Sequence, residues 1–84
     1  MKEAVRWLEV SANQGYGKAM GGLAYSYMRG EGVPHDDVKA LKWMILAAAH
    51  GHELSKQTIP YFEENMPKED IAEAERMAKE WEPE

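Results

Sequence analysis

The first amphipathic stretch of the chain predicts a helix over residues 2–13. One helical face of this stretch is shared by Ala4, Trp7, Leu8 and Ser11, and a glycine at position 15 follows as a C-terminal stop. A second apolar strip runs along the side of the same helix and consists of Met1, Val5 and Leu8. Exposed apolar strips are often contact surfaces, so this strip is either an incidental feature of a terminus or a docking face, for a second copy of the chain or within the molecule.

The second amphipathic stretch predicts a helix over residues 18–28 that ends at Gly30. Its apolar face repeats every four positions, at Ala19, Leu23 and Tyr27. Two adjacent glycines, Gly21 and Gly22, lie inside this helix, although each costs about 1 kcal/mol relative to alanine. Something must therefore approach the helix closely at this point, either a neighbouring helix or a bound chain.

The third predicted helix follows a short loop that contains Pro34 and stops at Gly51. Asp36 and Asp37 stand at its start, where they are expected to cap free N–H groups and to lie favourably at the positive end of the helix dipole. Residues 43–49 are apolar without a gap, which predicts burial on more than one side. Such a run is far shorter than the roughly 20 residues that cross a membrane.

The C-terminal third of the chain predicts two more helices. The first covers residues 53–65, with apolar positions at Leu54, Ile59 and Phe62. Pro60 should make this helix begin late, bend or break near residues 58–60, because proline removes a hydrogen bond and clashes one turn back. The last helix follows Pro67, and its apolar face is shared by Ile71, Ala74, either Met77 or Ala78, and Trp81. Its other face is charged, which is typical of a terminal cap.

Two segments of the chain repeat each other at an offset of 36 residues. Ala4, Trp7, Ala12 and Gly15 match, in the same order, Ala40, Trp43, Ala48 and Gly51. A period in the thirties is typical of helical hairpins that stack in line. The sequence therefore predicts an all-α fold, a short α-solenoid of about five helices in stacked antiparallel hairpins.

Composition narrows the class of protein. The 84 residues allow one small domain, and without cysteine neither disulfides nor a cysteine-based zinc site can support it. Residues 1–35 carry four basic and three acidic side chains, so the remaining 49 residues carry a net charge of −6 against a total of −5. The lack of a basic stripe disfavours nucleic acid and anionic lipid as partners. The opening residues are charged where a secretory leader would be apolar, so we expect a soluble chain with no membrane insertion in an unknown compartment.

Two clusters of polar residues could carry chemistry. His50, His52 and Glu53 suggest a metal site or an enzyme centre, but a helix break separates the two histidines and no third ligand is fixed nearby. Asp36 and Asp37, with the neighbouring histidine at position 35, are better explained as a helix cap. No Ser-His-Asp, Cys-His or paired-carboxylate spacing stands out. We therefore expect no catalytic residues, no metal and no cofactor, with an enzyme or metal-dependent sensor as the alternative.

The central residues resemble the Sel-one-like repeat (SLR) family, a relative of the tetratricopeptide repeats. The family pattern runs Ala, Leu-Gly, Tyr, Gly-x-Gly-Val, Asp, Ala-x-x-Trp/Tyr, Ala-Ala and Gly. The corresponding positions are Ala19, Leu23-Ala24, Tyr27, Gly30-Glu31-Gly32-Val33, Asp36, Ala40, Trp43, Ala47-Ala48 and Gly51, and Ala24 replaces the usual glycine. The match weakens after residue 52, since the positions that are usually Ala, Gly and Tyr are occupied by Ser55, Pro60 and Glu63.

The resemblance implies a right-handed solenoid that scaffolds protein partners. Residues 1–15 would be the second helix of a preceding repeat and 16–51 one complete repeat. Residues 53–66 would be a degenerate first helix of a last repeat, and 67–82 a C-terminal capping helix. By this division the chain resembles the C-terminal end of an array.

The family uses a concave groove, lined by the first helix of each repeat, to hold a protein or peptide partner. Carried onto this chain, the groove residues of the second helix are Lys18, Gly21, Gly22, Tyr25, Met28 and Arg29. Those of the fourth helix are Leu54, Gln57 and Tyr61. The glycines would let a partner backbone come near, and Lys18 and Arg29 could hold a carboxylate. Tyr25 and Met28 would either contact the partner or pack against the neighbouring helix.

Overall fold

The prediction of an all-α protein is confirmed. The structure is a computed structural model that describes residues 2–81, with side chains described from residue 5 onward. Within residues 2–81 the chain forms five helices and no strand. The helices are α1 (Lys2–Asn13), α2 (Gly17–Arg29), α3 (Asp37–Ala49), α4 (Glu53–Asn65) and α5 (Lys68–Glu80).

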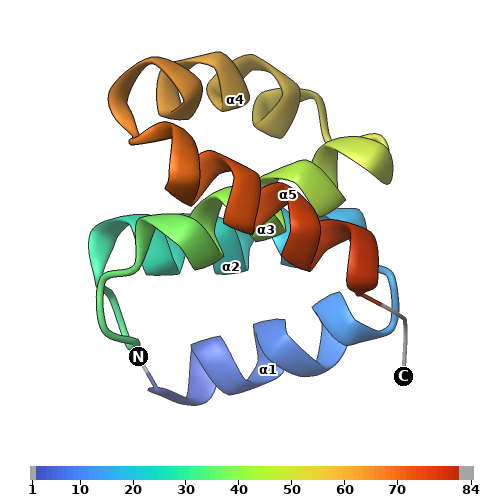
Figure 1. The fold of residues 1–84 in the computed structure, drawn as a ribbon. Helices are drawn as coiled ribbons and strands as arrows, with labels where there is room; N and C mark the ends of the chain where they lie inside the picture. Colours follow the sequence, from blue (N-terminus) through green and yellow to red (C-terminus); the bar gives the residue numbers. More distant parts are fainter. Residues whose placement is uncertain (1, 82–84) are drawn as a thin grey trace.

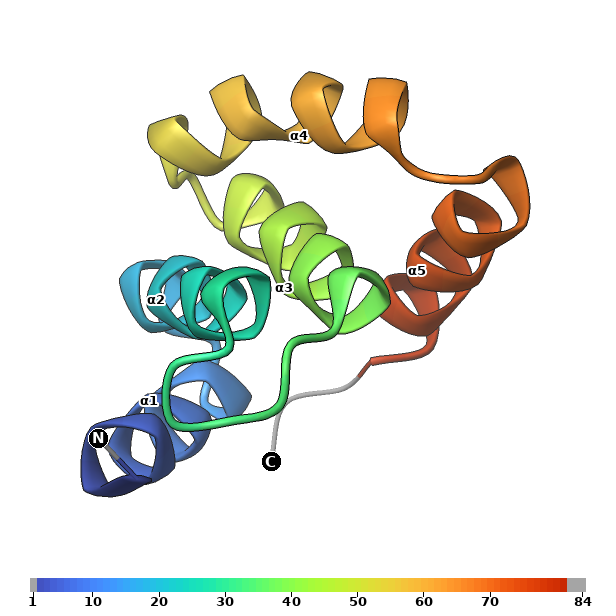
Figure 2. The same cartoon turned by 90° about the vertical axis from the view of Figure 1, so that its left-hand side faces the viewer.

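Consecutive helices pack on one another from α1 to α4, and α5 turns back to pack on α3 (Figure 1). In Figure 2, α2 and α3 are viewed roughly along their axes. Helix α4 lies across them, and α5 flanks α3 on the side away from α2. Helix α4 touches α5 only slightly. Because α3 packs against three helices, it is the centre of the fold.

The apolar run in α3 is buried on several sides, as its composition predicts. Leu41 and Ala47 are fully buried, and Trp43 is only 6% exposed. The Trp43 ring meets the Trp81 ring edge to face, with centroids 6.3 Å apart. This arrangement places α5 over the face of α3 that α2 leaves uncovered.

The helix ends also follow the sequence. Gly15, Gly30 and Gly51 adopt positive φ of 90°, 70° and 87° after the ends of α1, α2 and α3, the backbone region that glycine enters without a steric penalty. At the start of α3 the backbone N–H of Lys39 donates to Asp36 Oδ1 at 3.0 Å. The predicted cap is therefore confirmed.

Helix α4 excludes two of the three effects expected of Pro60, since it neither begins late nor breaks near the proline. It runs without interruption from Glu53 to Asn65 with the proline inside. The missing N–H would have donated to the carbonyl of Lys56, and both residues are exposed. Water can therefore hydrate the free carbonyl, which removes most of the penalty expected for an unpaired backbone group.

Helix α1 corrects a second expectation, because it is rotated relative to the prediction. Val5 is 6% exposed and belongs to the core, whereas Trp7 is 64% and Val10 56% exposed. Leu8 is half-buried and faces the glycine at position 22 of α2. Val5 therefore cannot serve the self-association face predicted from Met1, Val5 and Leu8, and Met1 lies outside the described residues. None of the described helices has the length and apolar character needed to cross a membrane.

Candidate partner-binding surface

The outer face of α2 is an exposed stripe formed by Lys18, Tyr25 and Arg29. All three side chains are exposed, Tyr25 to 44%. At about 100° per residue they fall within a sector of about 40° on the helix circumference. The guanidinium of Arg29 lies 5.5 Å from the centroid of the Tyr25 ring, a cation–π arrangement that holds the two side chains together. We call these three residues the α2 stripe.

The two glycines of α2 border this stripe and are covered by the chain itself. A Cβ on Gly21 would lie 2.5 Å from Cε1 of His52, and one on Gly22 would lie 3.0 Å from Cδ2 of Leu8. Of the two explanations for the glycine pair, close approach of neighbouring segments is therefore correct. Gly21 is buried, so it cannot line a groove for a partner as the sequence suggested.

Met28 also lies differently from the prediction. It is half-buried and packs against the hydrophobic core, which corresponds to the alternative of packing within the chain. The three residues predicted from α4 are all exposed, Leu54 to 55% and Tyr61 to 61%. Leu54, Gln57 and Tyr61 share one side of α4, since they lie within a sector of about 60°. We call them the α4 stripe.

The α2 stripe is the more basic of the two surfaces. Arg29 reaches the carboxylate of Glu31 in the following loop at 3.5 Å, between two exposed side chains. Such an exposed ion pair contributes little to stability, so Arg29 can exchange it for a carboxylate of another molecule. Lys18 adds a second cation near the start of the helix. The stripe thus combines an aromatic ring with positive charge.

His50, His52 and Glu53 do gather around one shallow hollow, with a volume of about 480 Å³, between the ends of the first four helices. Each of the three has a local partner. His50 Nδ1 lies 2.8 Å from the carbonyl oxygen of Leu46, and His52 Nδ1 lies 2.6 Å from Ser55 Oγ. Glu53 accepts from Lys56 Nζ at 3.3 Å. Among the described residues, no three His, Cys, Asp or Glu side chains are grouped so as to hold a metal ion.

The second polar cluster is a helix start. Asp36 caps α3, and His35 Nε2 lies 2.9 Å from Asp37 Oδ1 on the surface. These contacts use the acidic and imidazole groups locally, as expected for capping rather than for a ligand site.

Two features of the structure could not be found by sequence reasoning. The first is the position of Trp81, whose Nε1 donates to Asn13 Oδ1 at 3.3 Å and so ties the end of α5 to the end of α1. The second is an apolar groove between α3, α4 and α5. Both depend on the direction in which α5 turns back, and the periodicity of its residues carries no signal for that direction.

Comparison with known proteins gives one family. No curated protein matches the chain closely enough to count as a relative. The family model for the Sel1 repeat matches residues 1–16 and 17–52, which is more than half of the chain. Repeats of this family are helical, form solenoids and generally mediate contacts between proteins, typically without enzymatic activity. The match, together with the stacked helices described above, shows that this chain belongs to the Sel1 repeat family.

Proposed function

We propose that this chain is a non-enzymatic adaptor module that binds a partner polypeptide on its concave face, over the α2 stripe and with the α4 stripe beside it. The observation that carries the proposal is the exposure of large apolar side chains on these two helices. Tyr25, Leu54 and Tyr61 are 44%, 55% and 61% exposed. Protein interfaces are enriched in tyrosine and arginine at their energetic centres, and the α2 stripe contains both.

The division of the chain into repeats supports the same proposal. We assign α1 as the second helix of one repeat, α2 and α3 as a complete repeat, α4 as a degenerate first helix and α5 as the cap. In this assignment α2 and α4 are equivalent first helices. Their exposed stripes would therefore form one continuous surface, as in other solenoids.

The chemistry of the α2 stripe suggests an acidic partner segment. Lys18 and Arg29 would pair with carboxylates, and Tyr25 would cover an apolar side chain of the partner. We assign no catalytic role to His50 or His52. The Nδ1 atom of His50 lies within hydrogen-bonding distance of the Leu46 carbonyl oxygen, and that of His52 lies within the same range of Ser55 Oγ.

Partner capture tests the proposal. The double variant Tyr25→Ala/Arg29→Ala should lose the partner captured by the wild-type chain, because it removes both members of the cation–π pair. Its far-ultraviolet circular dichroism should stay unchanged, since both side chains are exposed. A matched control is Arg6→Ala/Tyr16→Ala, which removes the same two residue types from exposed positions on the α1 side. If the Tyr25→Ala/Arg29→Ala variant captured as much partner as the control variant and the wild-type chain, the binding site would not lie on α2.

A specific observation favours self-association as a second candidate function. Trp7 and Val10 on α1 are 64% and 56% exposed, which is unusual for a tryptophan without a contact partner. If this face joins two copies, Trp7→Asp should lower the sedimentation coefficient of the wild-type species to that of a monomer. A wild-type chain that already sediments as a monomer would remove this candidate.

A further inference from the structure

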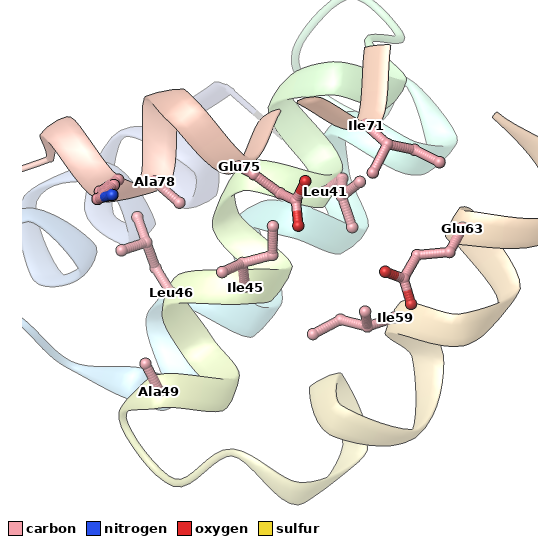
Figure 3. A pocket seen from close by; sticks show the side chains of 10 residues that line it. Leu41, Ile45, Leu46, Ala49, Ile59, Glu63, Ile71, Glu75 and Ala78 are labelled. Carbon is pink, nitrogen blue, oxygen red and sulfur yellow. The ribbon is translucent and has the colours of Figure 1, made fainter. Parts of the chain in front are cut away.

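A groove between α3, α4 and α5 is lined mainly by aliphatic side chains, with three charged residues among the lining. It encloses about 450 Å³ and opens between α4 and α5, which hardly touch. Leu41, Ile45, Leu46 and Ala49 form its floor on α3 (Figure 3). Ile59 of α4 lies on one wall, and Ile71 and Ala78 of α5 lie on the other.

The groove is distinct from the proposed partner surface. Helix α2 contributes no residue to its lining. On α4, Ile59 and Glu63 lie nearly opposite Leu54, as the turn of about 100° per residue requires. Helix α4 therefore presents one side to each surface.

Aliphatic side chains in this groove remain partly uncovered. Ile45, Ile59 and Ile71 are each half-buried, and Ala49 is exposed. Protein interiors are normally packed without such space, and covering apolar area is favourable. An aliphatic group of suitable size would therefore gain free energy by entering the groove.

The opening of the groove is acidic on both sides. Glu63 extends from α4 and Glu75 from α5, and their carboxylates point from opposite walls towards the space between the helices (Figure 3). Neither carboxylate has an ion-pair partner within residues 5–81. The nearby Arg76 pairs with Glu73 and Glu80, so it does not neutralise them. Lys79 is the one cation of the lining.

We propose that this groove binds a short peptide segment that places one or two aliphatic side chains next to lysine or arginine. The aliphatic groups would fill the floor, and the cations would meet Glu63 and Glu75 at the opening. The net charge of −6 on the last 49 residues favours the approach of such a basic segment. The proposed specificity is opposite to that of the basic α2 stripe, so the groove is a second and independent site.

Selection from a random 12-residue peptide display library on the immobilised 84-residue chain tests the proposal. The selected peptides should contain an aliphatic residue within one helical turn of lysine or arginine. Their binding, measured with synthetic peptides by fluorescence anisotropy, should weaken about three- to tenfold in Glu63→Gln/Glu75→Gln. The control variant Glu64→Gln/Glu69→Gln removes equal charge from exposed positions of the same two helices that do not line the groove. It should change the affinity by less than about twofold.

A second variant tests the apolar floor. Ala49→Phe should fill the groove and abolish peptide binding, and because Ala49 is exposed the fold should tolerate the larger side chain. Amide chemical shifts on peptide addition should move in α3, α4 and α5. An empty selection, peptides without basic residues or equal binding to Ala49→Phe would overturn the proposal. Shifts confined to α2 would also overturn it while supporting the function proposed for the α2 stripe, so the two failures can be told apart.

Discussion

Two tryptophans at equivalent positions of the internal repeat have opposite environments. Trp43 is 6% exposed and Trp7 is 64% exposed, although they lie 36 residues apart in the same pattern. The Trp43 ring is covered by Trp81, which directly follows α5, and by the Nζ of Lys42, 4.4 Å from its centroid. Trp7 lies on the outer side of α1. A sequence repeat therefore predicts the helix but not which of its faces is covered.

This difference makes the two tryptophans a matched pair for a stability measurement. Trp43→Ala should lower the free energy of unfolding by about 3–5 kcal/mol, the usual cost of emptying a buried aromatic site. Trp7→Ala should change it by less than about 1 kcal/mol, because an exposed side chain loses few contacts. Urea denaturation followed by circular dichroism measures both. Similar midpoints for the two variants would contradict the burial of Trp43.

The close packing of Gly21 against the His52 ring can be tested by adding a single methyl group. Alanine normally stabilises a helix interior by about 1 kcal/mol relative to glycine, but the new Cβ would lie 2.5 Å from the His52 ring. The ring would have to move and release Ser55, which is 1% exposed and lies 2.6 Å from His52 Nδ1. Gly21→Ala should therefore destabilise the wild-type chain by about 1 kcal/mol or more.

A double-mutant cycle separates the clash from other effects. In a His52→Ala background the ring is absent, and Gly21→Ala should stabilise the chain by about 0.5–1 kcal/mol. Chemical denaturation of the four proteins gives both differences. The same effect of Gly21→Ala with and without His52 would show that the histidine does not limit this position.

Tyr27 should make stability depend on alkaline pH. Burial, and then the carboxylates of Glu9 and Asp36, raise the pKa of Tyr27 above its usual 10.0. The folded chain therefore keeps this proton where the unfolded chain has lost it. The resulting stabilisation is present below pH 10.0 and is lost as pH rises through the folded pKa.

Tyr27→Phe removes this dependence, so its urea midpoint should fall less than that of the wild type between about pH 9 and pH 11. Lys42 acts in the opposite direction. Burial, and then Lys39, lower its pKa from 10.5, so its contribution to stability rises with pH up to 10.5. Both proteins contain Lys42, and the difference between them isolates Tyr27. Parallel pH profiles would contradict the raised pKa of Tyr27.

At the scale of the helix, local residue chemistry predicted most of what the structure shows. Glycines with positive φ end α1, α2 and α3, and Asp36 starts α3, because these effects act within a few residues. The rotation of α1 was not predictable in this way. Its apolar residues lie on more than one face, so periodicity alone could not decide between Val5 and Trp7 for the core.

The proline inside α4 should lower the stability of this helix. Pro60 is exposed and leaves the Lys56 carbonyl without its helical N–H partner. Pro60→Ala should restore that bond and raise the free energy of unfolding by about 2 kcal/mol. This value is the proline penalty of about 3 kcal/mol less the roughly 0.4–1 kcal/mol that proline contributes by reducing the entropy of the unfolded chain. Thermal unfolding measures the change, and a lower midpoint would show that α4 needs the proline.

The whole molecule is a solenoid too short to be elongated. Its Cα radius of gyration is 11.5 Å, close to the roughly 12 Å expected for any compact chain of this length. The contact of Trp81 with Asn13 joins the two ends of the stack. The repeat pattern predicts the stacked helices, the central position of α3 and the terminal position of α5. The contact between Trp81 and Asn13 and the acidic groove arise only because α5 folds back onto α3.

The candidate surfaces were predicted only in part, for the same reason. Exposure of Lys18, Tyr25 and Arg29 agrees with their spacing on one side of α2. The burial of Gly21 depends on His52, which is distant in the sequence and reaches α2 through the start of α4. Contacts between segments of this kind are set by packing and leave no local pattern.

Site-specific photo-crosslinking tests the central proposal most directly. Benzoylphenylalanine is introduced at position 25 on α2 or, in a matched protein, at position 7 on α1, where the natural residues are both exposed aromatics. Irradiation in the presence of cell extract should give a covalent adduct with a second polypeptide from position 25 and none from position 7. Adducts from position 7 alone would contradict a binding surface on α2, and if the attached chain is a second copy they would establish self-association through α1.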